Sequence, residues 1–191
     1  MMLYNLAGVL MPTASEAIKP VLKRQYHASL AMLGEAIQRC PDDLWLASDH
    51  TNAFWQIAYH ALYFTHMYSQ PDEAAFRPWE QHQDANQYPD GIPGPPDPGS
   101  SLPLLPKAYT KAQTLEYWKY CDGMIDGAVE ALDLESPQCG FSWYRMSKLE
   151  HQFVSIRHIQ HHVAQLADRL RSAANIGVEW VGGDEDSAAH L

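Results

Sequence analysis

The sequence is short of cysteine, of positive charge and of long apolar runs, and each shortage disfavours a class of function. Its three cysteines, Cys40, Cys121 and Cys139, are scattered and form no CxxC pair. We therefore expect no disulfide framework, and a reducing cytoplasm as the compartment. With 13 Lys and Arg against 23 Asp and Glu, the formal net charge of −10 disfavours binding to nucleic acid and to anionic membranes. No run reaches the roughly 18 apolar residues that a membrane-spanning helix needs.

The two ends of the sequence carry few signals. No Lys or Arg precedes Lys19, so the positive region of a signal peptide is missing, and we interpret residues 1–11 as a packed N-terminal arm. Residues 178–191 are acidic, which predicts a solvated tail. The acidic residues there are Glu179, Asp184, Glu185 and Asp186. The 191 residues suffice for one domain with its own core.

Four segments have the apolar spacing of helices, at about residues 20–39, 51–69, 110–132 and 147–174. Pro20 suits the first turn of the first segment, and Asp49 is the expected N-cap of the second. The second segment is apolar around most of its circumference, which predicts a helix buried on several sides. Asn175 and Gly177 are typical of a helix end and follow the fourth segment.

A proline-rich stretch at residues 70–107 separates the second and third helices and holds nine of the 13 prolines. No regular helix or central strand survives that density of proline. We expect its first part to pack on the body through Phe76, Trp79 and Tyr88, and residues 90–96 to be more exposed. Four long helices without an alternating strand pattern predict an all-α four-helix bundle. The long crossover would allow the second and third helices to run parallel.

Two further packing predictions concern the third and fourth helices. Gly123 and Gly127 are four residues apart, so they share a face and would permit close contact with a neighbouring helix, although glycine also weakens a helix. Tyr120 and Phe153 are among the positions expected in the core.

Four of the ten histidines fall within twelve residues of the last predicted helix: His151, His158, His161 and His162. His158 and His162 are four residues apart, so their side chains share a face and can bind the same ion. His151 lies two turns before His158 on roughly that face. His161 is rotated by about 100° and points elsewhere.

A metal site needs a third ligand from another helix, and His60 is the best candidate. It lies among apolar residues of the most buried helix, where its ring nitrogens need partners. His66 faces nearly the opposite direction, and His50 lies at the start of the helix. His27 on the first helix is a candidate ligand or outer-shell group. The alternative interpretation is that all of these are ordinary core or surface histidines.

Two stretches of the sequence resemble the DinB/YfiT-like family. The segment WQIAYH at residues 55–60, preceded by a PDDLW turn at residues 41–45, resembles the second-helix region of that family. The segment HIQHHVAQL at residues 158–166 resembles its late HxxHHxGQL motif, with Ala164 where the family often has glycine. The resemblance covers about residues 20–172 and implies a four-helix bundle with up-down-down-up topology.

The resemblance also implies a metal site of three histidines, one from the second helix and two from the fourth. By position these are His60, His158 and His162, the same ligands that helical spacing and the apolar surroundings of His60 favour. Three neutral imidazoles leave coordination positions open, as in a catalytic site rather than a closed structural one. We expect zinc or nickel, with iron as a further option. Such an ion would lower the pKa of bound water to about 7 or activate a thiolate.

These features predict a metal-dependent enzyme of the hydrolase or thiol S-transferase type that acts on a small molecule. Thiol transfer would also require a low-molecular-weight thiol. Gln165, one turn beyond His162, is predicted to contact a ligand or to orient a histidine. Tyr63, His151 and His27 are weaker candidates for acid–base or outer-shell groups.

A second interpretation is a non-catalytic helical bundle that self-associates or binds a partner, with a structural metal or none. Trp143 and Trp180 lie outside the main helices and would then be interface residues, for example in a homodimer; otherwise they pack on the body. Nucleic-acid binding is suggested only by the DNA-damage name of the family, and the negative charge disfavours it.

Overall fold

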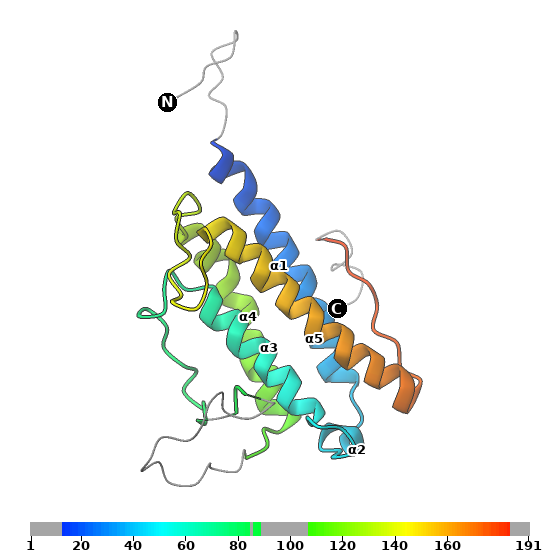
Figure 1. The fold of residues 1–191 in the computed structure, drawn as a ribbon. Helices are drawn as coiled ribbons and strands as arrows, with labels where there is room; N and C mark the ends of the chain where they lie inside the picture. Colours follow the sequence, from blue (N-terminus) through cyan, green and yellow to red (C-terminus); the bar gives the residue numbers. More distant parts are fainter. Residues whose placement is uncertain (1–12, 85, 89–106, 184–191) are drawn as a thin grey trace, which may run out of the picture.

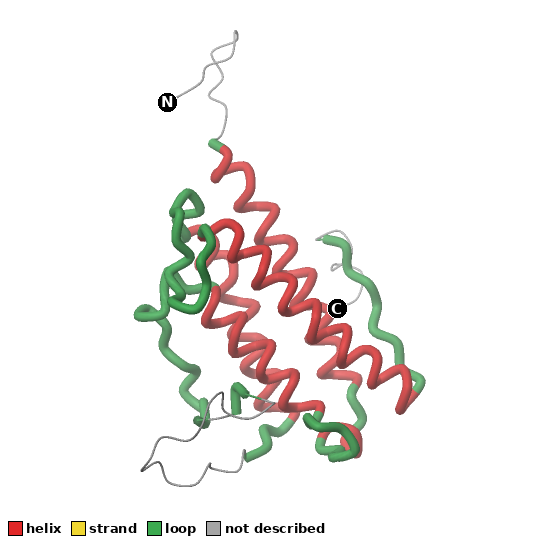
Figure 2. The backbone as a smooth tube through the Cα atoms, in the orientation of Figure 1, coloured by secondary structure: helices red, strands yellow, loops and turns green. Residues whose placement is uncertain are grey.

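The computed structural model describes residues 13–84, 86–88 and 107–183, and this part of the chain consists of helices and loops without strands (Figure 2). The all-α class is thereby confirmed. The helices are α1 (Ala14–Arg39), α2 (Asp42–Trp45), α3 (Phe54–Tyr68), α4 (Lys111–Ala131) and α5 (Lys148–Ala174). Not one of these helices combines the length and the apolar character that crossing a membrane requires.

Helix α1 begins six residues before the expected start, so the prediction that Pro20 occupies its first turn is wrong. The helix starts after Thr13, whose hydroxyl accepts a hydrogen bond from the Glu16 backbone N–H at 3.1 Å. The Glu16 carboxylate accepts in return from the Thr13 N–H at 2.6 Å. This reciprocal pair satisfies two donors at the helix end and sets the start of α1, and the helix continues through the interior Pro20.

The other long helices each start at the residue after their N-cap. Helix α3 begins at Phe54 rather than near Thr51, and Asp49 is not its cap, because Ala53 holds that position and accepts no side-chain bond. Thr110 and Ser147 cap α4 and α5 through hydroxyls that accept backbone hydrogen bonds, within one residue of the expected starts.

Each long helix packs against two others, α1 against α4 and α5, and α3 against the same two. Helices α3 and α4 both begin near α2 and run in one direction, whereas α1 and α5 run in the opposite direction (Figure 1). The crossover therefore joins two parallel helices. Because α3 and α5 are antiparallel neighbours, residues late in α3 face residues early in α5.

Helix α3 lies in the core, as its apolar circumference predicts, and 11 of its 15 residues are buried. Tyr59 is fully buried, with the rings of Tyr109 and Tyr117 at centroid distances of 4.5 and 5.5 Å. These contacts fix the orientation of α3 about its axis, so His60, the next residue, is held toward α5.

Close helix contact occurs at a different glycine from those predicted. Gly123 and Gly127 are exposed, and a Cβ atom added at either would meet nothing within 4 Å. At Gly34 on α1, an added Cβ would lie 2.7 Å from the indole of Trp118 on α4. The prediction of a close contact at Gly123 and Gly127 is wrong, because these glycines lie on the solvent-exposed face of α4, whereas Trp118 lies on the face that packs against α1.

Two residues assigned to the core are half exposed, Tyr120 at 49% and Phe153 at 50%, so those predictions are wrong. Apolar residues spaced three and four apart can belong to either of two adjacent faces of a helix. Only one of these faces is covered by neighbouring helices, and Tyr120 and Phe153 lie on the other. Trp143 and Trp180 are also exposed, at 47% and 75%. Their proposed role at an interface stays a prediction.

The first part of the proline-rich crossover packs on the body, as expected. Phe76 and Trp79 are buried, and Trp79 stacks on Tyr117 at a centroid distance of 4.6 Å. Tyr88 is half-buried. The predictions for the N-terminal arm, for residues 90–96 and for residues 184–191 of the acidic tail fall outside the described residues. For residues 178–183 the prediction of a solvated tail is wrong in part, because Val181 is buried against the core and Val178 packs on it.

Candidate metal centre

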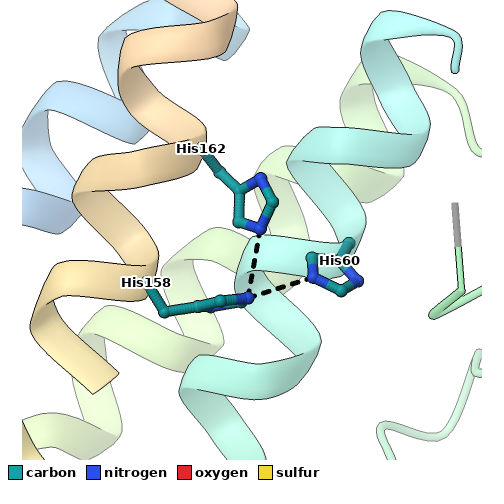
Figure 3. Close-up of side chains that lie close together, drawn as sticks. All are labelled: His60, His158 and His162. Atoms are coloured by element: carbon teal, nitrogen blue, oxygen red, sulfur yellow. Dashed lines mark hydrogen bonds between the residues drawn. The ribbon is translucent and has the colours of Figure 1, made fainter. Parts of the chain in front are cut away.

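Three histidines converge between α3 and α5. His60 extends from α3, and His158 and His162 extend from successive turns of α5 (Figure 3). The Nε2 atom of His158 lies 3.0 Å from Nε2 of His60 and 3.1 Å from Nε2 of His162. One ring nitrogen from each histidine falls within 4.8 Å of the other two, so the group could hold a metal ion.

The outward nitrogens of two of these rings fix which inward nitrogens carry lone pairs. His60 Nδ1 lies 2.6 Å from the carbonyl oxygen of Gln87. His162 Nδ1 lies 2.8 Å from Oε1 of Gln165. Both oxygens accept only, so each Nδ1 is the protonated donor and each neutral ring presents an unprotonated Nε2 to the centre. Two lone pairs therefore face His158 Nε2.

His158 is the central ring, and it is neutral at ordinary pH. Its pKa is lowered to about 3, first by burial and then by the neighbouring His162, His60 and His161. Its Nδ1 atom is buried and has no hydrogen-bond partner among the described residues. A neutral imidazole is the form that binds a metal, so low proton affinity favours the ligand role.

The donor set and its spacing fit a divalent transition metal. Zinc binds imidazole nitrogen at about 2.0–2.1 Å, and tetrahedral geometry then separates two such nitrogens by roughly 3.3 Å. The two measured Nε2 separations of 3.0 and 3.1 Å are close to this value. Without an ion, a proton on His158 Nε2 satisfies only one of the two facing lone pairs, whereas a cation at the centre can accept lone pairs from all three rings.

An aromatic wall borders the three histidines on one side. The ring of Phe64, one turn after His60 on α3, lies 4.8 Å from the His60 ring and 5.6 Å from the His158 ring. Tyr68, a further turn along, lies 6.3 Å from the His158 ring. These rings make this side of the centre apolar, as expected from the composition of α3.

Gln165 contacts a histidine as the sequence suggested, whereas Tyr63 points elsewhere. The rings that contact Tyr63 among the described residues include Phe76 at 5.3 Å and His82 at 5.1 Å, but none of the three central histidines. Burial raises the pKa of Tyr63 to about 12. It therefore stays protonated and offers no base to the centre.

His151 shares the face of α5 with His158 but does not join the cluster. It is fully buried, with the rings of Tyr68, Phe141 and Tyr144 at 4.7, 4.9 and 5.1 Å. Neither ring nitrogen has a hydrogen-bond partner among the described residues. The structure therefore does not place His151 at the centre as an acid–base group, and the ring of Tyr68 contacts both His151 and His158.

His27 is also not a ligand of this group. Its Nδ1 lies 2.7 Å from a carboxylate oxygen of Asp122, and its Nε2 lies 3.2 Å from one of Asp126. Hydrogen bonding to Asp122, more than any other cause, raises the pKa of His27 to about 9. The ring therefore joins α1 to α4 as a cation. His66, passed over as a ligand, lies instead beside Tyr117 and Tyr120.

The comparisons with known proteins give no relative. No family model, no curated protein and no solved structure matches this chain. The support for the candidate metal centre is therefore the geometry of the residues themselves.

One group at the centre was not predicted from the sequence, namely the Gln87 carbonyl that contacts His60 Nδ1. No side-chain pattern could have indicated it, because it is a backbone group.

Proposed function

We propose that this chain is a metal-dependent enzyme in which His60, His158 and His162 bind one divalent transition-metal ion. The observation that carries the proposal is the convergence of three Nε2 atoms, two of them with lone pairs fixed by outward hydrogen bonds. Outward bonds of this kind are typical of metal-binding histidines, since they set the tautomer and orient the ring.

We further propose that the fold is a four-helix bundle with the up-down-down-up topology of the DinB/YfiT-like family. The directions of the four long helices support this topology, with α1 and α5 running one way and α3 and α4 the other. Ligands from the second and last long helices also agree with what the resemblance implies.

A catalytic centre is favoured over a structural one by the number of ligands. Structural zinc sites in proteins are closed by four side chains, whereas catalytic ones use three and keep a position for water or substrate. Within the described residues the group contains three metal-ligating side chains. A bound zinc, nickel or iron ion would supply Lewis-acid chemistry, lowering the pKa of a coordinated water or thiol. We propose hydrolysis or thiol transfer on a small molecule as the reaction class.

Metal analysis tests the centre. We expect the purified protein to hold about one equivalent of a transition metal, and the His158→Ala/His162→Ala variant to hold almost none. The matched control is His161→Ala, which removes an exposed histidine from the same turn of α5 and should leave the content unchanged. Equal metal content in the parent protein and the double variant would exclude the site.

Activity assays then test the enzyme. The metal-loaded protein is compared with the chelated protein and with the double variant, against ester and amide substrates and against electrophiles with a thiol donor. We expect turnover that is lost on chelation and restored by adding the metal back. A loaded protein without turnover in either series would favour a non-catalytic role.

A further inference from the structure

Arg169 lies on the same face of α5 as the two histidines of the candidate metal centre. It follows His162 by seven residues, which is about two turns and roughly 10 Å along the helix axis. At about 100° per residue, its direction falls between those of His158 and His162. Its side chain reaches across to the segment before α3, where Nη1 donates to the carbonyl oxygen of Asn52 at 2.6 Å.

No counter-charge from the described residues contacts the guanidinium of Arg169. It is partly buried, and no carboxylate lies within 4.0 Å of it among the described residues. Burial lowers its pKa, and the more distant charge of Asp49 opposes that shift. Removing a cation from water without a paired anion is costly, and a guanidinium with one bond made retains donors for a planar oxyanion.

The side chains around the three histidines therefore differ from one end to the other. Phe64 follows His60 by one turn and supplies an aromatic side. In the antiparallel α3–α5 pair, Gln165 and Arg169 lie toward the opposite end. A ligand lying along this face would meet apolar rings, then the ion, then a cation.

We propose that the small molecule bound at the metal carries a carboxylate that pairs with Arg169. This proposal rests on the proposed metal centre and names the substrate class for it: an organic anion with a metal-binding group about six bonds from its carboxylate. The six-bond span is scaled to the roughly 10 Å axial separation of His162 and Arg169, less the lengths of the two contacts that the ligand would make at its ends. The Asn52 bond holds the guanidinium in place for this contact.

The competing role for Arg169 is a structural link between α5 and the start of α3. Both roles predict that its loss destabilises the protein, so stability alone cannot separate them. Only recognition of an anion predicts a preference for a carboxylate over its neutral ester. The test therefore measures ligand affinity at the metal.

The experiment uses the full-length protein loaded with cobalt(II), whose thiolate complexes have a charge-transfer absorption band. Titration with ω-mercaptohexanoate and with its methyl ester gives two dissociation constants. We expect the acid to bind about tenfold tighter than the ester. Arg169→Gln should abolish this preference and leave the ester affinity unchanged. Arg157→Gln, an exposed arginine on another face of α5, should retain it.

The outcomes distinguish the proposed role of Arg169 from the proposed metal centre on which it rests. Failure of the protein to bind cobalt would overturn the metal centre itself. Cobalt binding with equal affinities for acid and ester, or a preference that persists in Arg169→Gln, would overturn the role of Arg169 alone. If the glutamine variant does not fold, Arg169→Lys replaces it: the loss of the planar, two-pronged donor should weaken the preference for the acid, and an unchanged preference would overturn the role of Arg169.

Discussion

At the residue scale, the candidate metal centre depends on polar atoms one shell beyond the histidines. Gln165 and the Gln87 carbonyl hold two rings by their outward nitrogens. The third ring, His158, receives no such bond among the described residues and is positioned by packing against Phe64 and its fellow histidines. The three ligands are therefore not equivalent, and the outward hydrogen bond of His162 can be removed by mutation without changing the other two rings.

Replacing Gln165 tests one of these supports. Gln165→Leu removes the oxygen that accepts from His162 Nδ1, so the ring loses its fixed tautomer and orientation. Loss of an outer-shell partner typically costs about 10–100-fold in metal affinity, and we expect a decrease in this range by competition with a chromophoric chelator. Gln165→Glu keeps an accepting oxygen and should retain most of the affinity. Equal affinities in the parent protein and Gln165→Leu would show that packing alone orients His162.

His151 is a buried polar group whose ring nitrogens have no hydrogen-bond partner among the described residues, and we predict that it destabilises the fold. Its pKa is lowered to about 4, first by burial and then by the charge of Lys148. His151→Leu removes both unpaired nitrogens at similar volume and should raise the free energy of unfolding by about 1–3 kcal/mol at neutral pH. The measurement is urea unfolding followed by circular dichroism.

The pH dependence of the same variant gives a second readout. Because the folded-state pKa of His151, about 4, lies below its unfolded value near 6.5, the unfolded state takes up the proton first as the pH falls. The parent protein therefore loses stability between about pH 6.5 and pH 4, and His151→Leu should lose less over that window. Parallel pH profiles would contradict the buried, unpaired state of this ring.

At the element scale, the helices were predictable where a side chain caps them. Thr110, Ser147 and Asn175 are recognisable in the sequence, and Asn175 has the left-handed φ of 53° that suits a helix end. The start of α1 was also encoded in the sequence, as a Thr13-x-x-Glu16 capping box. The predicted start was nevertheless placed at Pro20, because proline is common in the first turn of a helix. At the start of α3, Ala53 offers no side-chain acceptor, and the capping bond there runs from the Ala53 N–H to Gln56 Oε1 at 2.7 Å, so the sequence contained only half of a capping signal.

The candidate site was predictable from helical spacing on α5 and from the apolar surroundings of His60 on α3, whereas contacts that depend on how two helices are aligned were not. The interval between His158 and His162 fixes a shared face on one helix, whatever surrounds it. The pairing of His27 with Asp122 depends on how α1 and α4 are aligned, which spacing within either helix does not specify. The burial of Gly34 against Trp118 likewise depends on the alignment of α1 and α4.

A pair of glycine substitutions tests the α1–α4 contact. Gly34→Ala places a Cβ atom 2.7 Å from the Trp118 ring, which also donates to the Leu30 carbonyl, so the indole cannot move freely. We expect a loss of about 1–3 kcal/mol in the free energy of unfolding. Gly127→Ala, with open space around the new atom, should instead stabilise by about 0.5–1 kcal/mol. A neutral or stabilising Gly34→Ala would contradict the close approach of these two helices.

At the scale of the whole molecule, a bound ion would join two helices that are otherwise held by side-chain packing. Helix α3 packs on α4 and α5, and the three histidines lie on its α5 side. Any ligand that binds only the folded state stabilises it by mass action. The metal centre should therefore contribute to the stability of the entire fold as well as to chemistry.

Thermal unfolding with and without zinc measures that contribution. At a free ion concentration of about 100 times Kd, the stabilisation is about 2.7 kcal/mol, which for a chain of this size raises Tm by roughly 5–10 °C. We expect this shift in the parent protein and its absence in His158→Ala/His162→Ala. The same shift in both proteins would place the zinc at other residues.

The order of the ligands along the chain has a consequence for how the protein is made. His60 and His158 are 98 positions apart, so a ribosome must translate the crossover, α4 and the first half of α5 before the second ligand exists. Until then the nascent chain offers one histidine of the three, which binds transition metals weakly. An ion at the proposed centre can therefore be held by all three ligands only after the first turns of α5, through His162, have been translated.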